Sequence, residues 1–431
     1  MSERPQVIVI GGGFGGLTAA RELADEYVGI TLVDRANHHL FQPLLYQVAT
    51  AGLSPTDIAV PIRRVLTKQD NVRVLLSEVT AIQLDERTVE LDDGTRLPFD
   101  VLVLAAGARN DYFGNEAWRE HTLGLKTVDD ALEIRKRVLL SFEAAEREKD
   151  EARRKRLMTF VVIGGGPTGV EVAGALSDLA RTVLDEDFRA IDPSGARVLL
   201  VEMADRVLAG VFDEKLCRRA QEQLEELGVE VRLGTPVKEI DERGIRLGDE
   251  RIDAATVLWT AGVRGRGVAE TLGVELDKNG RVVVEPDCSI PGHPRCFVIG
   301  DLASFTPPGK DKPLPGLAPV ALQQGRHVAK NVPRVLRGER TLEFSYVDKG
   351  VMATIGRSRA VAETLGGRVR VTGFIAWLTW LFVHIWFLID FRNRVSVLLN
   401  WFWAYVTYRR GSRLITGRRP WELLRDQRPR E

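Results

Sequence analysis

The sequence predicts an α/β fold of two domains of one kind, the second inserted into the first, followed by a helical C-terminal segment of another kind. Three observations lead to this prediction. Two glycine-rich turns each connect an apolar strand to a helix. A later strand resumes the pattern of the first turn. Residues 373–408 are apolar and rich in tryptophan.

The first glycine turn follows the apolar residues 7–10 and precedes a helix. Its glycines at positions 11, 13 and 16 fit G-x-G-x-x-G, in which the first allows a tight turn, the second lets the backbone approach a pyrophosphate, and the third lets the helix pack on the strand. The next apolar strand ends at Asp34, where a carboxylate can accept hydrogen bonds from a ribose. We therefore expect a Rossmann-like domain with a bound dinucleotide rather than a plain glycine-rich turn.

The same pattern recurs with glycines at positions 164, 166 and 169, and the strand that follows ends at Glu202. Self-similarity of this kind indicates a duplicated unit, so the chain is expected to bind two dinucleotides. An acid beside the adenosine ribose favours NADH over NADPH, because an NADP site usually carries a cation there.

Two dinucleotide sites in one chain suit a flavin that stays bound and a nicotinamide that comes and goes. After the second domain, strand 296–299 ends in Gly300-Asp301, and residues 315–325 form a loop that enters a helix. Asp301 is placed to hold the flavin ribityl chain, with a helix N-cap as the alternative. Glu171, expected in the first turn of the second glycine helix, faces the crevice between the cofactors or else stabilises the start of its helix.

Composition and the N-terminal sequence argue against several other classes of protein. The 60 basic and 60 acidic residues cancel, so nothing indicates a nucleic-acid partner. The three cysteines form neither a C-x-x-C pair nor a metal-ligand spacing, so we expect no metal and a reducing cytoplasm. The N-terminus enters a strand at Val7, which does not fit a signal peptide.

The C-terminal segment differs in kind from the rest of the chain. Residues 373–389 carry no charge, residues 395–408 are again apolar, and residues 409–431 are rich in arginine. Seventeen helical residues reach roughly 25 Å, short of the roughly 30 Å hydrocarbon core of a bilayer. Because tryptophan and arginine favour the headgroup zone, we expect two helices that lie on a membrane. A dimer interface or buried helix pair, and a spanning helix, are the alternatives.

Several stretches of the chain resemble a known family. They are GGGFGG at 11–16, FQPLLYQVAT at 41–50, AAGA at 105–108, GGGPTGVEVAGAL at 164–176, VEMADRVL at 201–208, GDLA at 300–303 and PGLAPVALQQG at 315–325. They are similar to type II NADH dehydrogenase, the single-chain NADH:quinone oxidoreductase, and the resemblance covers nearly the whole chain. The glycine motifs alone indicate only the disulfide-reductase-like flavoprotein superfamily, and the stretches at 41–50 and 315–325 narrow it to this family.

The resemblance implies one tightly bound FAD, NADH as substrate and a membrane quinone as acceptor. The residues it implies for FAD are Gly11, Gly13, Phe14, Gly15, Gly16, Asp34, Arg35, Val79, Ala106, Gly107, Gly300, Asp301 and Ala318. The residues it implies for NADH are Gly164, Gly166, Pro167, Thr168, Gly169, Glu202, Ala261 and Gly262, with Glu171 as a catalytic residue.

The resemblance also implies a quinone tunnel that opens toward the C-terminal segment. Gln47 falls in the family's tunnel-lining stretch, and Gln323 matches the second glutamine of its A-Q-x-x-x-Q pattern. Both are therefore candidate catalytic residues, with helix-surface amides as the alternative. Pro319 replaces the first glutamine of that pattern and has no amide to offer a quinone carbonyl, so Gln324 is the residue that could compensate.

The expected organisation follows from these assignments. We expect residues 1–125 and 271–370 to form the FAD-binding domain, 126–270 the NADH-binding domain, and 371–431 the membrane-anchoring helices. The protein is expected at the cytoplasmic face of the inner membrane as a peripheral protein, with a homodimer through the C-terminal region left open. No run of helices provides a proton path, so NADH oxidation is expected not to pump protons.

Four other functions share this scaffold. A disulfide reductase needs a redox cysteine pair after the first glycine turn, where residues 17–60 contain no cysteine. A sulfide:quinone oxidoreductase needs cysteines near the flavin, for which Cys288 and Cys296 are poorly placed. A ferredoxin or rubredoxin reductase would not need the apolar C-terminal segment. A flavoprotein that binds NADH and acts through partner contacts, as apoptosis-inducing-factor-like proteins do, is the non-enzymatic alternative.

Overall fold

The computed structural model describes residues 4–185, 187–364, 366–407 and 412–415. The chain forms two compact units, each assembled from three separate segments. Unit 1 comprises residues 1–40, 59–109 and 263–347. Unit 2 comprises residues 41–58, 110–262 and 348–431.

Unit 1 is built on a six-stranded sheet with the strand order β21-β22-β9-β1-β2-β5. Its strands are β1 (Gln6–Ile10), β2 (Gly29–Asp34), β5 (Val72–Leu76), β9 (Val101–Leu104), β21 (Ser289–Ile290) and β22 (His293–Val298). All except β21 run parallel, so their carboxyl ends meet at one edge of the sheet. The continuous apolar runs of β1 and β9 are typical of parallel strands that are covered on both faces.

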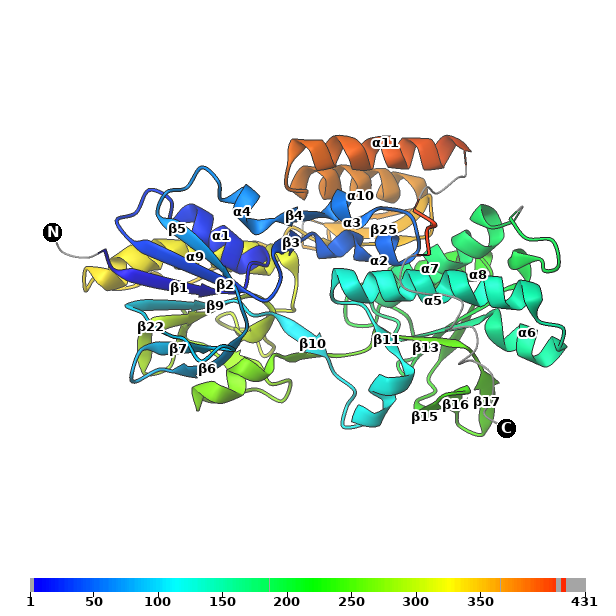
Figure 1. The fold of residues 1–431 in the computed structure, drawn as a ribbon, viewed down its shortest axis with the longest axis horizontal. Coiled ribbons are helices and arrows are strands. Elements are labelled where there is room, and N and C mark those ends of the chain that lie inside the picture. Colours follow the sequence, from blue (N-terminus) through cyan, green and yellow to red (C-terminus); the bar gives the residue numbers. More distant parts are fainter. Residues whose placement is uncertain (1–3, 186, 365, 408–411, 416–431) are drawn as a thin grey trace. The chain divides into compact units, whose positions relative to one another are not determined.

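Two helices cover one face of this sheet, and a small sheet lies on the other (Figure 1). The helices are α1 (Phe14–Glu22) and α9 (Ala318–Leu336). They meet so closely that a β-carbon at Gly325 would lie 2.5 Å from the backbone oxygen of Gly15. The small sheet contains β6 (Val79–Gln83), β7 (Thr88–Leu91) and β8 (Arg96–Pro98). The other short elements of unit 1 are β3 (His38–Leu40), β4 (Ala59–Pro61), α4 (Ile62–Val65), β19 (Val263–Gly265), η5 (Gly267–Leu272), β20 (Val282–Val283), η6 (Gly300–Leu302) and β23 (Ala303–Ser304).

Unit 2 repeats the architecture with a five-stranded parallel sheet in the order β11-β18-β12-β13-β14. The strands are β11 (Leu123–Gly124), β12 (Thr159–Ile163), β13 (Arg197–Glu202), β14 (Val229–Leu233) and β18 (Thr256–Trp259). The elements that accompany them are β10 (Ala108–Asn110) at the entry to the unit, η2 (Glu116–His121), α5 (Val128–Arg147), α6 (Glu151–Leu157), α7 (Pro167–Asp178), η3 (Leu179–Val183), η4 (Pro193–Gly195) and α8 (Glu214–Glu226).

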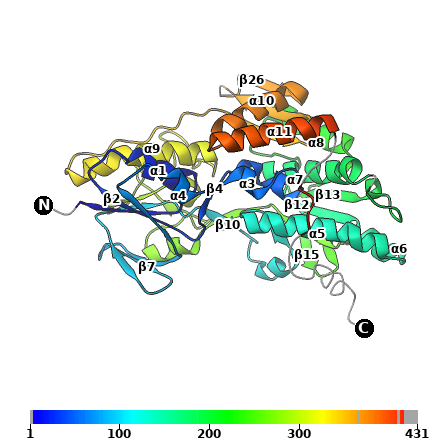
Figure 2. The ribbon, with the colours of Figure 1, turned by 45° about the horizontal axis from the view of Figure 1, so that its top comes forward.

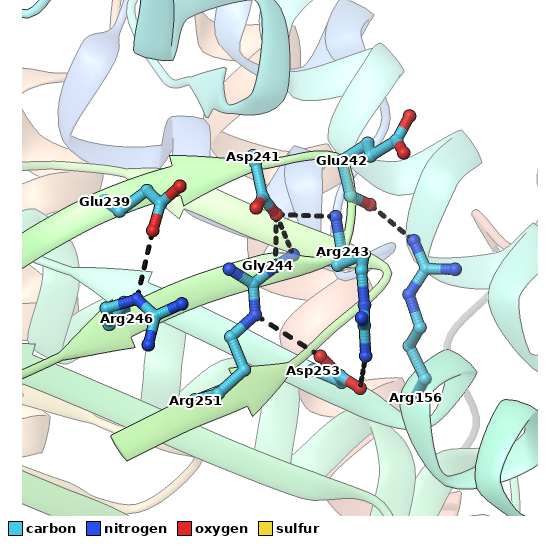
Figure 3. Close-up of polar contacts among 9 residues, drawn as sticks. All are labelled: Arg156, Glu239, Asp241, Glu242, Arg243, Gly244, Arg246, Arg251 and Asp253. Carbon is cyan, nitrogen blue, oxygen red and sulfur yellow. Dashed lines mark hydrogen bonds and ion pairs between the residues drawn. The ribbon is translucent and has the colours of Figure 1, made fainter. Parts of the chain in front are cut away.

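A charged three-stranded sheet also belongs to unit 2, formed by β15 (Val237–Asp241), β16 (Gly244–Leu247) and β17 (Glu250–Asp253). Figure 3 shows that arginines and carboxylates of these strands and of the turn between β15 and β16 pair with one another. Arg251 bonds both Asp241 and Asp253, and its guanidinium holds the pKa of Asp241 below the usual value. Arg246 pairs with Glu239 at 3.0 Å. Such partly exposed pairs contribute about 0–1 kcal/mol each, so this sheet presents a solvated surface.

The C-terminal part of unit 2 consists of an antiparallel sheet and two helices. The strands are β24 (Val351–Ile355), β25 (Arg359–Thr364) and β26 (Val369–Thr372), and the helices are α10 (Gly373–Phe387) and α11 (Phe391–Thr407). Helix α10 packs on these strands, and α11 lies beside α10 (Figure 2). Two helices from the N-terminal region also belong to unit 2. Helix α2 (Leu45–Ala49), which follows η1 (Gln42–Leu44), packs on α5 and α7. Helix α3 (Pro55–Ile58) packs on α11.

The predicted fold class is confirmed, with two Rossmann-like sheets, the second inserted into the first, and a C-terminal helical segment. The compact units divide the chain differently from the predicted ranges in several places. Residues 110–125 belong to unit 2, residues 263–270 belong to unit 1, and residues 371–431 are part of unit 2 rather than a separate domain. Residues 41–58 belong to unit 2, because α2 packs on α5 and α7, and so do residues 348–370, whose strands pack on α7 and α10. The cofactor assigned to each range stays a prediction. None of the helices that the structure describes is long and apolar enough to cross a membrane.

Candidate functional site

The first glycine turn has the backbone geometry that its motif requires. Gly11 has a φ of +100°, and a β-carbon there would overlap the carbonyl oxygen of Ala105. A β-carbon at Gly16 would overlap the carbonyl oxygen of Gly11. At Gly13, by contrast, no described atom lies within 4 Å of the β-carbon position. The outer glycines therefore permit the turn and the packing, and the middle one leaves room for a phosphate group to approach the backbone.

Asp34 ends β2 beside this turn. One carboxylate oxygen accepts the amide N–H of Gly12 at 2.5 Å, and the other accepts the amide N–H of Ala36 at 2.7 Å. Each oxygen keeps a further lone pair, which is what a ribose diol would need. The backbone thus fixes the carboxylate at the turn, in the position predicted from the sequence.

His39 was not predicted as a site residue, yet it lies against the same turn. Its Nδ1 contacts the carbonyl oxygen of Gly12 at 3.0 Å, and its ring packs edge-on against Phe14 at 5.1 Å between centroids. Burial lowers the pKa of His39, so the ring is neutral, with its proton on Nδ1 facing the carbonyl. Its Nε2 is then an acceptor, buried and without a partner among the described residues. A cofactor hydroxyl would satisfy it, so this corner fits a bound dinucleotide.

The other residues predicted for FAD gather at the same edge of the sheet. Ala106 and Gly107 follow β9, Gly300-Asp301 follows β22, and Arg35 and Val79 follow β2 and β5. Arg35 forms an exposed ion pair with Glu78 at 3.6 Å. The carboxyl edge of a parallel sheet is where nucleotides bind in folds of this kind, so these positions are compatible with the prediction, and the role of each residue stays a prediction.

Helix α9 begins at the same edge, at Ala318. A β-carbon at Gly316, in the loop before it, would lie 3.0 Å from the carboxylate of Asp301. The amide of Gly300 donates to the side-chain oxygen of Gln324 at 2.8 Å, and Gln324 is buried. The carboxamide of Gln324 therefore holds the Gly300 turn, which argues against its replacing the amide that Pro319 lacks.

The second glycine turn repeats the first in detail. Gly164 has a φ of +108°, and a β-carbon there would lie 2.6 Å from the amide nitrogen of Ala261. A β-carbon at Gly169 would overlap the carbonyl oxygen of Gly164, and the position at Gly166 has no described atom within 4 Å. Pro167 opens α7, and Thr168 follows it on an exposed position.

Glu202 ends β13 in the role that Asp34 has in unit 1. Its two oxygens accept the amides of Gly165 at 2.6 Å and Ala204 at 2.8 Å. The nearby cation, Arg206, is paired with Asp205 at 2.9 Å. A 2′-phosphate would therefore meet the carboxylate of Glu202 and a guanidinium that already has a partner. Ala261 and Gly262 follow β18 at the same edge of the sheet.

Glu171 lies one turn further along α7 than predicted, because the helix begins at Pro167 and its first turn holds no acid. Its carboxyl accepts the backbone N–H of Thr354 at 3.4 Å. Burial of the carboxyl raises the pKa of Glu171 to about 8. The group therefore carries a proton at neutral pH and is placed to hold or release one near the end of the physiological range.

The two predicted glutamines are held by different partners. Gln47 accepts the indole N–H of Trp401 at 2.7 Å and donates to the hydroxyl of Tyr46 at 3.0 Å. Gln323 exchanges two hydrogen bonds of 3.0 Å with the backbone of Val347. Neither is a simple surface amide, although each keeps one N–H that these bonds do not use.

Comparisons with known proteins bear on this geometry. Residues 5–325 match the family model for pyridine nucleotide-disulphide oxidoreductase, and residues 349–410 match that for the NDH2 C-terminal domain. The type II NADH:quinone oxidoreductase Ndh of Mycobacterium tuberculosis is 46% identical over 98% of this chain and 92% of its own length. The chain belongs to the type II NADH:quinone oxidoreductase family.

Two further relatives extend the comparison. The family member from Staphylococcus aureus is 34% identical over 84% of this chain and 90% of its own length. The structure of NDH2 from Plasmodium falciparum in complex with NADH has a TM-score of 0.87 at 17% identity and covers 96% of this chain and 100% of that one. At that identity, the match shows the shared fold.

The cysteines in this family member are all buried. Burial raises the pKa of Cys217 and Cys288, and raises that of Cys296 to about 12. Because the thiolate is the reactive form, these thiols are poor redox groups. No cluster of ligating side chains that could hold a metal ion is found among the described residues.

The pKa of Glu171 makes a prediction about stability. The unfolded chain loses this proton near pH 4.5, whereas the folded chain keeps it to about pH 8. The free energy of unfolding should therefore fall by roughly a few kcal/mol as pH rises through that window, and level off above it. Glu171→Gln removes the titration and keeps an acceptor for Thr354. Its melting temperature relative to the unaltered protein should rise from pH 5 to about pH 8.5.

Melting curves across that pH range test this prediction. The matched control is Glu143→Gln, which alters an exposed glutamate on α5 and should show a difference that does not change with pH. A constant difference for Glu171→Gln as well would contradict the assignment of a raised pKa to this carboxyl group.

Proposed function

We propose that this protein oxidises NADH and reduces a membrane quinone through a tightly bound FAD, without pumping protons. The overall reaction is NADH + H⁺ + quinone → NAD⁺ + quinol. The observation that carries the proposal is the duplicated turn, in which Gly12 and Asp34 in unit 1 match Gly165 and Glu202 in unit 2 bond for bond. Two such sites suit one resident and one exchanging dinucleotide.

The resident FAD is assigned to unit 1 and NADH to unit 2. FAD, when bound, supplies the chemistry that accepts a hydride and passes on two electrons. In unit 1, Asp34 is assigned to the adenosine ribose and Asp301 to the ribityl chain. The Nε2 of His39, which has no hydrogen-bond partner within the described part of the chain, is assigned to a cofactor hydroxyl. In unit 2, Glu202 is assigned to the NADH ribose and Glu171 to holding a proton close to the exchanging substrate.

The quinone is assigned to Gln47 and Gln323, whose remaining N–H groups can donate to quinone carbonyls. The carboxamide of Gln323 also forms two hydrogen bonds with the backbone of Val347, the last residue of unit 1. The same carboxamide would therefore bind the quinone and hold the end of this segment in place. The rival functions that depend on redox cysteines gain no support, because all three thiols are buried.

The C-terminal helices are assigned to a lipid surface, and the arrangement of α11 supports this. In a soluble protein the polar face of a helix usually points outward, but here two polar side chains of α11 make inward hydrogen bonds while most of its apolar residues are exposed. Ser396 and Asn400 bond the buried carboxylate of Asp57 at 2.6 and 3.2 Å, and Trp401 bonds Gln47. The outward face, with that of α10, forms an apolar patch of Phe374, Ile375, Leu378, Phe382, Trp386, Phe387, Phe391, Val395, Leu398, Leu399, Phe402 and Trp403.

An exposed apolar patch of this extent marks a membrane or protein contact. We assign it to the membrane in which a lipid quinone would reside, at the cytoplasmic face where NADH is available. The arginine-rich residues 409–431 lie mostly outside the described residues, so the charge attraction predicted for them rests on the sequence. A homodimer that covers the same patch is the alternative, and the membrane experiment below distinguishes the two.

A flavin spectrum tests the reaction directly. The purified protein should show flavin absorbance that NADH bleaches under anaerobic conditions and that a short-chain quinone restores. Flavin released by acid should approach one per chain. A colourless folded protein, or bleaching that quinone fails to reverse, would count against the proposal.

The choice of nicotinamide gives a second prediction. Glu202→Ala removes the carboxylate that would repel a 2′-phosphate, so the preference for NADH over NADPH in kcat/KM should narrow by about tenfold or more. Glu202→Gln keeps an oxygen that can accept a backbone N–H but removes the negative charge. Comparing the two variants separates loss of repulsion between Glu202 and the 2′-phosphate from distortion of the glycine turn. If the unaltered protein preferred NADPH, the role assigned to Glu202 would be wrong.

The patch gives a third prediction. Replacing three of its outward residues together, as Phe382→Ser, Leu399→Ser and Phe402→Ser, should lower binding to anionic lipid vesicles by at least about tenfold, because less apolar area enters the lipid. Flotation on vesicles measures this, and Leu76→Ser, which alters an exposed leucine of unit 1, is the control. Unchanged flotation with a change from dimer to monomer in sedimentation would favour the dimer instead.

A further inference from the structure

A chain of hydrogen bonds crosses unit 2 from α11 to Glu171. It starts at the indole N–H of Trp401, which donates to the side-chain oxygen of Gln47 at 2.7 Å. The amide of Gln47 donates to the hydroxyl of Tyr46 at 3.0 Å, and that hydroxyl lies 2.9 Å from the hydroxyl of Thr354. The backbone N–H of Thr354 then donates to the carboxyl of Glu171 at 3.4 Å.

Trp401 sets the direction of this chain because it can only donate. An indole has an N–H and no acceptor, so the atom of Gln47 that faces it must be the oxygen. The nitrogen of the carboxamide is thereby turned toward Tyr46. The Tyr46 hydroxyl accepts from Gln47, and either this hydroxyl or that of Thr354 donates in the bond between them. The indole N–H of Trp401 thus selects one of the two orientations, related by exchange of oxygen and nitrogen, that the Gln47 carboxamide could adopt.

The orientation of the Gln47 amide matters for a quinone. Quinone carbonyls only accept hydrogen bonds, so a contact with Gln47 is productive when the amide presents its nitrogen and unproductive when it presents its oxygen. With the oxygen held by Trp401, one N–H of Gln47 goes to Tyr46, and no described residue accepts the other. That N–H is the group left for a substrate.

Trp401 is itself held in place. Its ring packs against the buried ring of Trp380 on α10, with 5.4 Å between centroids. The helix that carries it is anchored separately, through the bonds from Ser396 and Asn400 to Asp57. A variant that lacks the indole N–H keeps these bonds between α11 and Asp57. The effect of Trp401 on the orientation of Gln47 can therefore be measured separately from the packing of α11 on unit 2.

We propose that Trp401 is a positioning residue for quinone reduction, which holds the carboxamide of Gln47 with its N–H directed at the quinone carbonyl. The inference rests on the proposed contact between Gln47 and quinone. Because Trp401 belongs to the helix that carries the apolar patch, the membrane-facing segment also orients a residue of the quinone site. NADH oxidation by the flavin does not involve this link.

Trp401→Phe is the decisive variant, since it keeps an aromatic ring against Trp380 and removes the N–H. The loss of kcat/KM for a short-chain quinone should be roughly tenfold, as expected for one oriented hydrogen bond. Flavin reduction by NADH in stopped flow, reduction of ferricyanide, and vesicle flotation should stay unchanged, because none of them needs a donor to a carbonyl oxygen. A loss of ferricyanide reduction equal to that of quinone would overturn the proposal.

Ser396→Ala is the matched control, because it removes a different bond between α11 and the body of unit 2. Quinone kinetics should stay within about twofold of the unaltered protein, and a loss equal to that of Trp401→Phe would show that seating of the helix is responsible. Gln47→Glu is the second variant, since it can still accept from Trp401 but offers no N–H when ionised. It should lose quinone reduction even if Trp401→Phe folds poorly, and full activity would overturn the proposal.

A double-mutant cycle completes the test. If Trp401 acts through Gln47, adding Trp401→Phe to Gln47→Ala should cause no further loss beyond about twofold. A second full loss in the double variant would overturn the proposal. If Gln47→Ala impairs quinone reduction and Trp401→Phe does not, the positioning role fails and the proposed function stands. If neither variant changes it, the assignment of Gln47 to quinone fails as well.

Discussion

The bond between each glycine turn and the acid that ends the neighbouring strand is the constraint on which both nucleotide sites depend. Asp34 and Glu202 each accept two backbone amides, one from the middle of the glycine turn and one from two residues beyond the acid. Bonds to an ionised carboxylate are shorter and stronger than neutral ones, so they hold turn and strand end together. The orientation of the acid toward a ribose then follows from the backbone rather than from a flexible side chain.

The C-terminal helices obey a second constraint, which is that buried polar groups need partners. Asp57 is a buried carboxylate that accepts from the backbone N–H of Ser54 and from Ser396 and Asn400 on α11. This requirement turns Ser396 and Asn400 toward Asp57, while most of the apolar residues of α11, Val397 excepted, are exposed. The helix is thus tied to unit 2 by hydrogen bonds, while the surface it presents is suited to lipid. The same inward face brings Trp401 to Gln47 and joins the proposed quinone site to the helix pair.

The parts of the site that could be predicted are those coded by short stretches. The glycines, Asp34 and Glu202 lie where the strand–turn–helix pattern places them, because the pattern constrains the backbone within one local unit. Glu171 was placed on the correct helix but in its first turn, whereas the helix begins at Pro167 and Glu171 lies in the second turn. His39 was not predicted, although Phe14, against which it packs, was predicted as an FAD residue. Nothing in a sequence shows that an imidazole nitrogen will be buried without a hydrogen-bond partner among the described residues.

The sequence by itself determined the fold class, the two dinucleotide motifs, their acids and the apolar character of the C-terminal segment, because these depend on periodicity and on backbone needs that only glycine meets. The tertiary structure alone decided the partners of the amides. Gln324 holds Gly300, Gln323 holds Val347, and Gln47 is held by Trp401, far along the chain. A carboxamide can donate or accept equally well, so its role depends on which group the fold brings within 3 Å or so of it.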